Sequence, residues 1–179
     1  MEKIDVLNEK GEKTGEVISR EEVHRLGLWH KCVHIWIVNH KGEILLQKRS
    51  PQKATNPNKW TTATSGHLSA GDSSTEGAMR ELSEEIGLNV NENELEYLFT
   101  VKESDVNNNQ KKQIIEKEFT DVYLIRKDIA IANLKLQEEE VSSVKWFSPD
   151  EFKKMVIEND ENLVSHREMQ MKIIEILGI

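Results

Sequence analysis

The chain has 179 residues, of which 37% are hydrophobic, with a formal net charge of −8 at pH 7 and a pI near 5.3. This length suffices for a single domain over residues 1–179, and the acidic balance argues against a nucleic-acid polymer as partner, because phosphate backbones bind clustered Lys and Arg. One cysteine excludes an internal disulfide framework, and no segment has the roughly 20 apolar residues that span a bilayer, so we expect a cytoplasmic protein without a membrane partner.

The first 27 residues are expected to form an extension in front of a core at 28–179. Strands near residues 4–7 and 16–18 flank the turn-forming sequence Asn-Glu-Lys-Gly, which predicts a β-hairpin. A short helix is expected to begin at Ser19, where a glutamate three residues later gives capping-box spacing. The hairpin has two possible roles, covering a site or mediating a homodimer, and its composition does not choose between them.

Strands and helices alternate through the core. Runs rich in β-branched and aromatic residues predict strands, and the proline after Ser148 predicts the first turn of a helix. The expected strands lie at 29–38, 43–49, 95–102, 113–126 and 141–146, with a polar loop at 104–112 and a final helix at 165–177. Strands on both sides of a central helix, with more helices behind them, favour an α/β class in which a mixed sheet lies between helices.

The most informative segment begins at Gly66 and ends 22 residues later. It contains an N-capping serine, an apolar stripe and a terminating glycine, which together predict a helix. On that helix Glu81, Glu84 and Glu85 lie within about 100° of arc. Carboxylates so close repel one another unless a cation lies in front of them, and oxygen ligands on a rigid element suit Mg²⁺ or Mn²⁺.

An acidic run of this kind is usually an ordinary solvated helix face, but its surroundings are more specific. The pattern is glycine, five residues, Asp72, seven residues, then Arg-Glu-Leu-x-Glu-Glu-x-Gly-Leu, and it resembles the signature of the Nudix hydrolases along its whole length. One position departs from the family, which usually has glutamate in place of Asp72. The resemblance implies a Nudix-type α/β/α sandwich. It also implies hydrolysis of a diphosphate bond in a nucleoside diphosphate, alone or linked to another moiety.

The same resemblance implies roles for individual residues. The metal, Mg²⁺ or Mn²⁺, would be held at Gly66, Glu81, Glu84 and Glu85, and Glu84 and Glu85 would also take part in catalysis. Arg80 would brace the carboxylates by ion pairing. The implied partner is a small phosphorylated substrate.

A second resemblance covers more of the chain, from about residue 20 to 90. The runs Gly-Leu-Trp-His, His-Ile-Trp, Leu-Leu-Gln-Lys-Arg, Trp-Thr and Gly-His are similar to the isopentenyl-diphosphate isomerase branch of the Nudix superfamily. Those isomerases hold a metal with histidines and glutamates outside the signature helix. The matching residues in this chain are His24, His30, His67, Glu116 and Glu118.

The residue at position 65 separates the two chemistries. The isomerases use a cysteine directly before the Gly-His pair for proton transfer, whereas this chain has Ser65, whose hydroxyl is far less acidic than a thiol. Cys32 lies in an earlier strand and is interpreted as a small core residue. The complete signature without this thiol favours a hydrolase, with the isomerase as the alternative. In the hydrolase, Glu118 on a separate strand would be a remote metal ligand or general base.

Five further positions are candidates for substrate binding. A basic cluster after a strand suits phosphate oxygens, although solvated strand ends often look the same. A tryptophan can stack on a base or a prenyl-like group but is more often a core residue, and the histidine after the signature glycine can bind phosphate or metal. These candidates are Lys48, Arg49, Lys53, Trp60 and His67. A nucleotide-binding regulator without catalysis is a third interpretation, which the intact signature disfavours.

Overall fold

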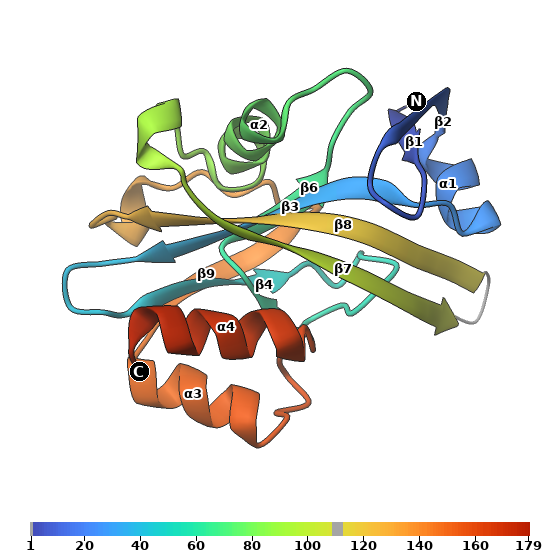
Figure 1. Ribbon diagram of the computed structural model, residues 1–179. Coiled ribbons are helices and arrows are strands. Elements are labelled where there is room, and N and C mark those ends of the chain that lie inside the picture. The colour runs from blue at the N-terminus through green and yellow to red at the C-terminus, as the bar shows by residue number, and fades with distance from the viewer. Residues whose placement is uncertain (1, 109–112) are drawn as a thin grey trace.

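The computed structural model describes residues 2–108 and 113–179, and its centre is a seven-stranded sheet between helices (Figure 1). The strands of this sheet are β3 (His30–Val38), β4 (Ile44–Arg49), β5 (Trp60–Thr61), β6 (Thr64–His67), β7 (Glu96–Asn108), β8 (Gln113–Arg126) and β9 (Val141–Phe147). The helices are α1 (Arg20–Leu26), α2 (Ser74–Ile86), α3 (Pro149–Ile157) and α4 (Arg167–Leu177), with 3-10 turns η1 (Glu92–Glu94) and η2 (Ile131–Asn133).

The sheet is mixed and has a helical layer on each face. Its strand order is β5-β4-β3-β8-β7, with β6 also paired to β3 and β9 to β4. Helix α2 lies on one face, and α3 and α4 lie on the other (Figure 1). The predicted α/β class, with a mixed sheet between helices, is confirmed. Within the described residues, no helix has the length and apolar composition needed to cross a membrane.

Central strand β3 divides the interior into two cores. Val33, Ile35 and Ile37 pack in the core beneath α2, while Trp36 and Val38 pack in the core beside α3 and α4. Because successive side chains of a strand point to opposite faces, positions 30, 32 and 34 share the second face with Trp36. Two of those three positions are histidines.

The register of the neighbouring strands brings more polar residues to that face. β3 runs parallel to β8 with His30 opposite Glu118, and antiparallel to β6 with His34 opposite Ser65. The next β6 residue, Gly66, lies on the α2 face by the same alternation. Strand β6 therefore separates two sets of functional candidates.

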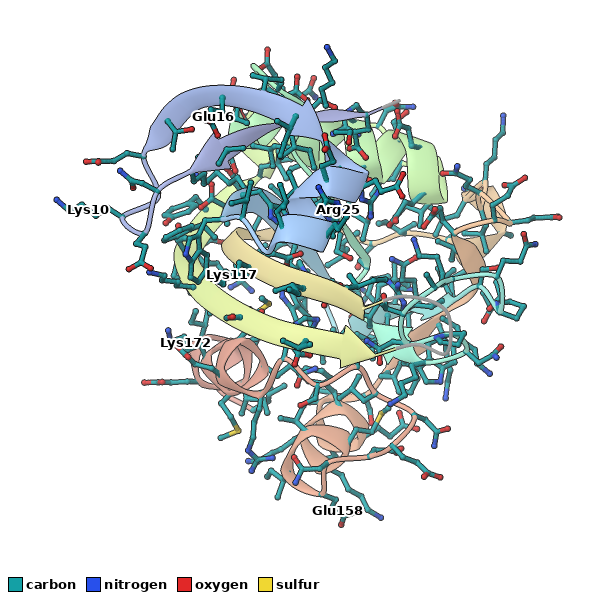
Figure 2. All side chains as sticks on the ribbon, turned by 90° about the vertical axis from the view of Figure 1, so that its right-hand side faces the viewer. Lys10, Glu16, Arg25, Lys117, Glu158 and Lys172 are labelled. Carbon is teal, nitrogen blue, oxygen red and sulfur yellow. The ribbon has the colours of Figure 1, made fainter. Side chains whose placement is uncertain are left out.

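The N-terminal extension has the predicted hairpin and helix. β1 (Lys3–Leu7) pairs with β2 (Lys13–Ser19), and the Ser19 hydroxyl caps α1 by accepting from the Glu22 backbone N–H. Leu7 N–H donates to the Trp29 carbonyl at 2.8 Å, which attaches the hairpin to the core. Figure 2 looks onto the end of the sheet where α1, which carries Arg25, lies in front of β8.

Two expectations for the core were wrong or incomplete. The polar loop expected at 104–112 is a strand as far as Asn108, because β7 continues its antiparallel pairing with β8 from Glu103 opposite Glu118 to Asn108 opposite Gln113. Residues 109–112 lie outside the described part of the chain. Strands β5 and β6 were not expected, because β5 has only two residues and β6 has a single β-branched residue among its four.

Candidate active site

Helix α2 places two carboxylates against strand β6. Ser73 and Glu76 form a capping box at its N-terminus, and Gly87 ends it in the left-handed conformation. Glu81 lies directly over Gly66, where a Cβ would come within 2.5 Å of the carboxylate oxygens. Only glycine leaves room for this carboxylate, which gives a physical reason for the glycine that begins the signature.

Arg80 holds this carboxylate set together. Its Nη1 lies 2.8 Å from Glu81 Oε1 and 3.4 Å from Glu84 Oε2, and its Nη2 donates to the His67 carbonyl at 2.9 Å. Asp72 approaches Arg80 Nε at 3.6 Å, and that Nε has no hydrogen-bond partner in the part of the chain that the structure describes. The shorter aspartate therefore keeps the ion pair but not a close hydrogen bond.

Glu85 is the deeper of the two carboxylates on this face. Its Oε2 accepts from the Thr64 hydroxyl, from Gln47 Nε2 at 3.0 Å and from the Ser65 backbone N–H at 3.4 Å. Burial raises the pKa of Glu85, and burial together with the charge of Glu85 raises the pKa of Glu81 to about 7. Without a cation in front, the pair therefore resists being fully ionised at neutral pH.

This raised pKa predicts how pH changes stability without metal. The pKa of Glu81 is higher in the folded state than in the unfolded state. The stability that Glu81 contributes is therefore complete at pH values below its ordinary pKa, and it is lost as the pH rises through about 7. We expect the wild type in EDTA to lose up to about 3 kcal/mol relative to Glu81→Gln between pH 5 and pH 8. Urea unfolding at a series of pH values measures this difference.

Stabilisation by added Mg²⁺ is expected to grow over the same interval, because the metal competes with the proton. A difference between wild type and variant that does not change with pH would contradict this assignment.

A second cluster lies on the other face of β6. His24, His30, His67 and Glu118 each offer one ligand atom, and these atoms all lie within 4.8 Å of one another. His67 Nε2 is 3.1 Å from His24 Nε2, and Glu118 Oε1 is 3.6 Å from His30 Nε2. The four residues come from α1, β3, β6 and β8.

The protonation states in this cluster suit a divalent cation. His30 Nδ1 lies 3.0 Å from the Leu28 carbonyl, which orients the ring so that Nε2 faces the cluster. Burial lowers the pKa of His24 to about 4 and that of His67 well below its ordinary value, so both are neutral. Burial opposes the ionisation of Glu118, but hydrogen bonding with His30 lowers its pKa below the ordinary value, so it is an anion. Neutral imidazoles beside a carboxylate form a donor set that binds Mn²⁺ or Zn²⁺.

One cleft joins the two clusters. A cavity of about 630 Å³ borders His24 and Glu116, and an adjoining one of about 490 Å³ borders Glu81, Glu84 and Glu85. Both are lined by Arg20, Lys53, His67 and Glu140. The cleft thus has cations at its rim and candidate metal ligands at its base, an arrangement suited to a diphosphate with bound metal.

The five substrate-binding candidates divide into two groups. Arg49, Lys53 and His67 line the cleft, with Arg49 donating to the Thr55 carbonyl and Lys53 paired with Glu140. Trp60 instead packs edge-on against Phe147 at 5.0 Å, and Lys48 lies 5.9 Å from the Trp60 ring. Neither Lys48 nor Trp60 lines these two cavities.

Sequence reasoning missed three cleft residues. Arg20 lies one helical turn before His24 on α1, and this i, i+4 spacing was the available signal. Glu103 and His166, which are paired at 3.1 Å, line cavities next to the histidine cluster. No local pattern links these two positions, because they are 63 residues apart.

Most of the chain is similar to one protein family, since residues 28–166 match the NUDIX domain. The chain is 34% identical over 152 residues to an uncharacterized Nudix hydrolase of Clostridium acetobutylicum, covering 83% of this chain and 70% of that protein. It is 40% identical over 168 residues, 92% of its length, to Nudix hydrolase 3 of Arabidopsis thaliana, but it spans only 22% of that protein. It is also 30% identical over 147 residues to isopentenyl-diphosphate Delta-isomerase 2 of Photorhabdus laumondii, covering 82% of this chain and 77% of that protein.

Solved structures share the fold at lower identity. A crystal structure from Deinococcus radiodurans has a TM-score of 0.71 at 21% identity, covering 96% of this chain and 98% of that one. The NUDIX domain of Shewanella oneidensis NrtR, solved in complex with ADP ribose, has a TM-score of 0.53 at 17% identity, covering 81% of this chain and 83% of that one. At these identities the likeness is one of fold.

Proposed function

The chain belongs to the NUDIX domain family, and from this premise we propose that it is a hydrolase that cleaves a diphosphate bond. The substrate we propose is a nucleoside diphosphate, alone or linked to another moiety, bound with Mg²⁺ or Mn²⁺. The observation that carries the proposal is the intact carboxylate set of α2. Glu81 and Glu85 lie beside β6, and both border a cleft whose rim carries Arg20 and Lys53.

Glu81 and Glu85, with Glu84 and the backbone of Gly66, are the residues we propose to hold the catalytic metal. The donor set fits, because burial and the neighbouring charge of Glu85 raise the pKa of Glu81 and a bound cation would relieve the repulsion, while Gly66 leaves room for the Glu81 carboxylate beside β6. When bound, such a metal neutralises phosphate charge and lowers the pKa of coordinated water. We propose Glu84 or Glu118 as the general base.

The other residues bind and orient the substrate in this proposal. Arg80 keeps the carboxylates in place through its contacts with Glu81 and Glu84. Arg20, Arg49 and Lys53 bind phosphate oxygens from the rim of the cleft. The histidine cluster with Glu118 holds a further divalent cation, because one ligand atom from each of the four residues lies within 4.8 Å of the others.

Isomerisation of isopentenyl diphosphate is the weaker alternative. It is favoured by the histidine cluster and by the isomerase relatives, but Ser65 stands where those enzymes need a thiol. Cys32 borders the cavity that Ser65 lines, yet burial and the nearby Glu118 raise the pKa of its thiol. This thiol is therefore a poor substitute for a proton-transfer group near neutral pH.

A substrate screen separates the two activities. Nucleoside diphosphates, diphosphosugars, dinucleotides and isopentenyl diphosphate are incubated with the protein and Mg²⁺ or Mn²⁺, and both phosphate-bond cleavage and double-bond position are measured. We expect metal-dependent cleavage of at least one nucleotide and no allylic isomer. Rapid formation of the allylic isomer without any cleavage would refute the hydrolase proposal.

A further inference from the structure

Beyond the histidine cluster the cleft continues into a second space, here called the inner chamber. It consists of two adjoining cavities of about 110 and 350 Å³, which share Asn56, Glu116, Glu118, Val164 and His166. The smaller cavity is also bordered by His34 and Ser65, and the larger one by Glu103, Ser104 and Asp105. The chamber therefore lies on the α3 and α4 face of the sheet, on the far side of β6 from Glu81.

The His166 imidazole is fixed at the wall of this chamber. Its Nδ1 lies 3.1 Å from Glu103 Oε2, and its backbone N–H donates to Gln170 Oε1 at 3.3 Å. Gln170 is buried and donates from Nε2 to the Val164 carbonyl at 2.8 Å, so the segment that carries His166 is held on both sides. The carboxylate of Glu103 raises the pKa of His166 although burial opposes it. With Nδ1 held by a carboxylate, Nε2 is the nitrogen that remains for a ligand.

His34 forms a neutral polar surface next to His166. It is 6% exposed, its ring meets the His166 ring edge-on at 4.8 Å, and burial lowers its pKa to about 3. Its Nδ1 has no hydrogen-bond partner among residues 2–108 and 113–179. A buried polar atom without a partner costs free energy unless a ligand or water pairs with it.

The lining of the chamber restricts the kind of group it can bind. Among the described residues that border it, only Cys32 and Val164 are of hydrophobic type, so an alkyl or prenyl group would leave many polar atoms unpaired. The charged residues of the chamber are of both signs, since Glu103 and Asp105 lie in the same lining as Lys59, so a neutral group with both donors and acceptors can pair with them. A hydroxyl both accepts from an imidazole and donates to a carboxylate, so it matches this mixture of residues.

We propose that the inner chamber binds the group attached to the diphosphate and selects a hydroxyl-bearing group such as a sugar, with His166 as the residue that distinguishes it from an alkyl group. This inference rests on the proposed function, since it places the diphosphate at the cationic rim formed by Arg20, Arg49 and Lys53. Glu103 acts as a positioning residue, because it acts through His166.

Two ligands that share one nucleoside diphosphate test this selection. ADP-ribose carries a hydroxylated group, and the pentyl ester of ADP carries an alkyl group of similar length. Their dissociation constants are measured by calorimetry with Mg²⁺ in the Glu85→Gln background, where turnover does not interfere. The variants added to this background are His166→Phe, which keeps an aromatic ring, and Glu103→Gln, which removes the charge that orients His166. His40→Phe is the matched control, because His40 also pairs with a carboxylate, Asp128 at 2.7 Å, but is exposed and borders a different cavity.

The expected result is a change in selectivity rather than a general loss of binding. We expect ADP-ribose to bind about 100-fold more tightly than the pentyl ester, because a site built for hydroxyls rejects the analogue that lacks them. His166→Phe is expected to reduce this ratio at least tenfold, Glu103→Gln to reduce it by a smaller factor, and His40→Phe to leave it unchanged. The affinity for the pentyl ester is expected to stay the same or to rise in His166→Phe.

The outcomes distinguish this inference from the proposed hydrolase activity. An unchanged ratio in folded His166→Phe and Glu103→Gln proteins overturns the role of His166. Equal affinities for the two ligands in the parent, or no binding of either, overturn the selection of a hydroxylated group. The hydrolase proposal is tested separately, by cleavage of nucleotides with wild-type protein, and it can hold when the selectivity inference fails.

Discussion

Replacing Glu85 by glutamine is expected to lower kcat/KM for metal-dependent diphosphate cleavage about 1,000-fold. A catalytic metal contributes several kcal/mol to stabilising the charge of the transition state, and each 1.36 kcal/mol corresponds to a factor of ten in rate. Glutamine keeps the size of Glu85 and can still accept from Thr64 and Gln47, so the structure around it is retained. Steady-state phosphate release with wild type and variant at saturating Mg²⁺ measures the effect.

The thermal stability of Glu85→Gln is the control for its loss of activity. Burial raises the pKa of Glu85, so a neutral amide is cheaper to bury than the carboxylate, and the unfolding temperature without metal at pH 8 should stay the same or rise. The variant should also still bind one Mn²⁺ at the histidine cluster, detected by electron paramagnetic resonance, and lose it when His67→Asn is added. Full activity in a folded Glu85→Gln protein would remove Glu85 from the catalytic metal site.

The carboxylate site could be predicted because its geometry is local. The positions of Glu81, Glu84 and Glu85 on one side of α2 follow from the helical period, and the capping residues at both ends fix where the helix lies. The reason for Gly66 was not available from sequence, since the close approach of Glu81 depends on how α2 packs over β6. Spacing within one element is therefore predictable, whereas packing between elements is not.

The histidine cluster and the inner chamber illustrate the opposite case. His24 and Glu118 belong to elements far apart in the sequence, α1 and β8, and only the resemblance to the isomerase branch suggested that they meet. No family pattern pointed to Glu103 or His166. Glu103 was placed in strand β7 only by its continuous pairing with β8, where composition had predicted a loop from residue 104. Backbone pairing outweighs the polar character of a segment when the neighbouring strand is long enough to pair with it.

Trp60 shows why residue type alone does not separate a binding role from a packing role. Trp60 resembles a stacking residue in the sequence, yet the structure places it against Phe147 beside the second core, where its backbone pairs with the segment near Leu163. An aromatic residue beside a basic cluster is expected in a nucleotide site and also in a core, so its type alone does not decide. The role of such a residue depends on which face of the sheet its side chain points to, and this follows from how the strands pair.

Gly66→Ala is expected to be nearly as damaging to activity as loss of a metal ligand, although no charged group is removed. The added methyl group would occupy the space of the Glu81 carboxylate, so either this carboxylate leaves the site or β6 moves away from α2. Either change displaces a proposed metal ligand, and we expect a loss of at least about 100-fold in kcat/KM, because a shift of about 1 Å can cost that much. We also expect a destabilisation of about 1 to 3 kcal/mol from overpacking.

Gly77→Ala is the matched control for this substitution. Gly77 lies on α2 one helical turn before Glu81, but the new methyl group would meet only the Leu68 side chain, at 3.1 Å, and no carboxylate. Helix propensity favours alanine there by about 1 kcal/mol, which offsets the tight contact, so stability and activity should change little. If Gly66→Ala cleaves substrate as fast as Gly77→Ala at equal Mg²⁺ concentration, the catalytic metal is not held beside β6. The carboxylates of α2 would then be an ordinary acidic helix face, the interpretation that their bare sequence first suggested.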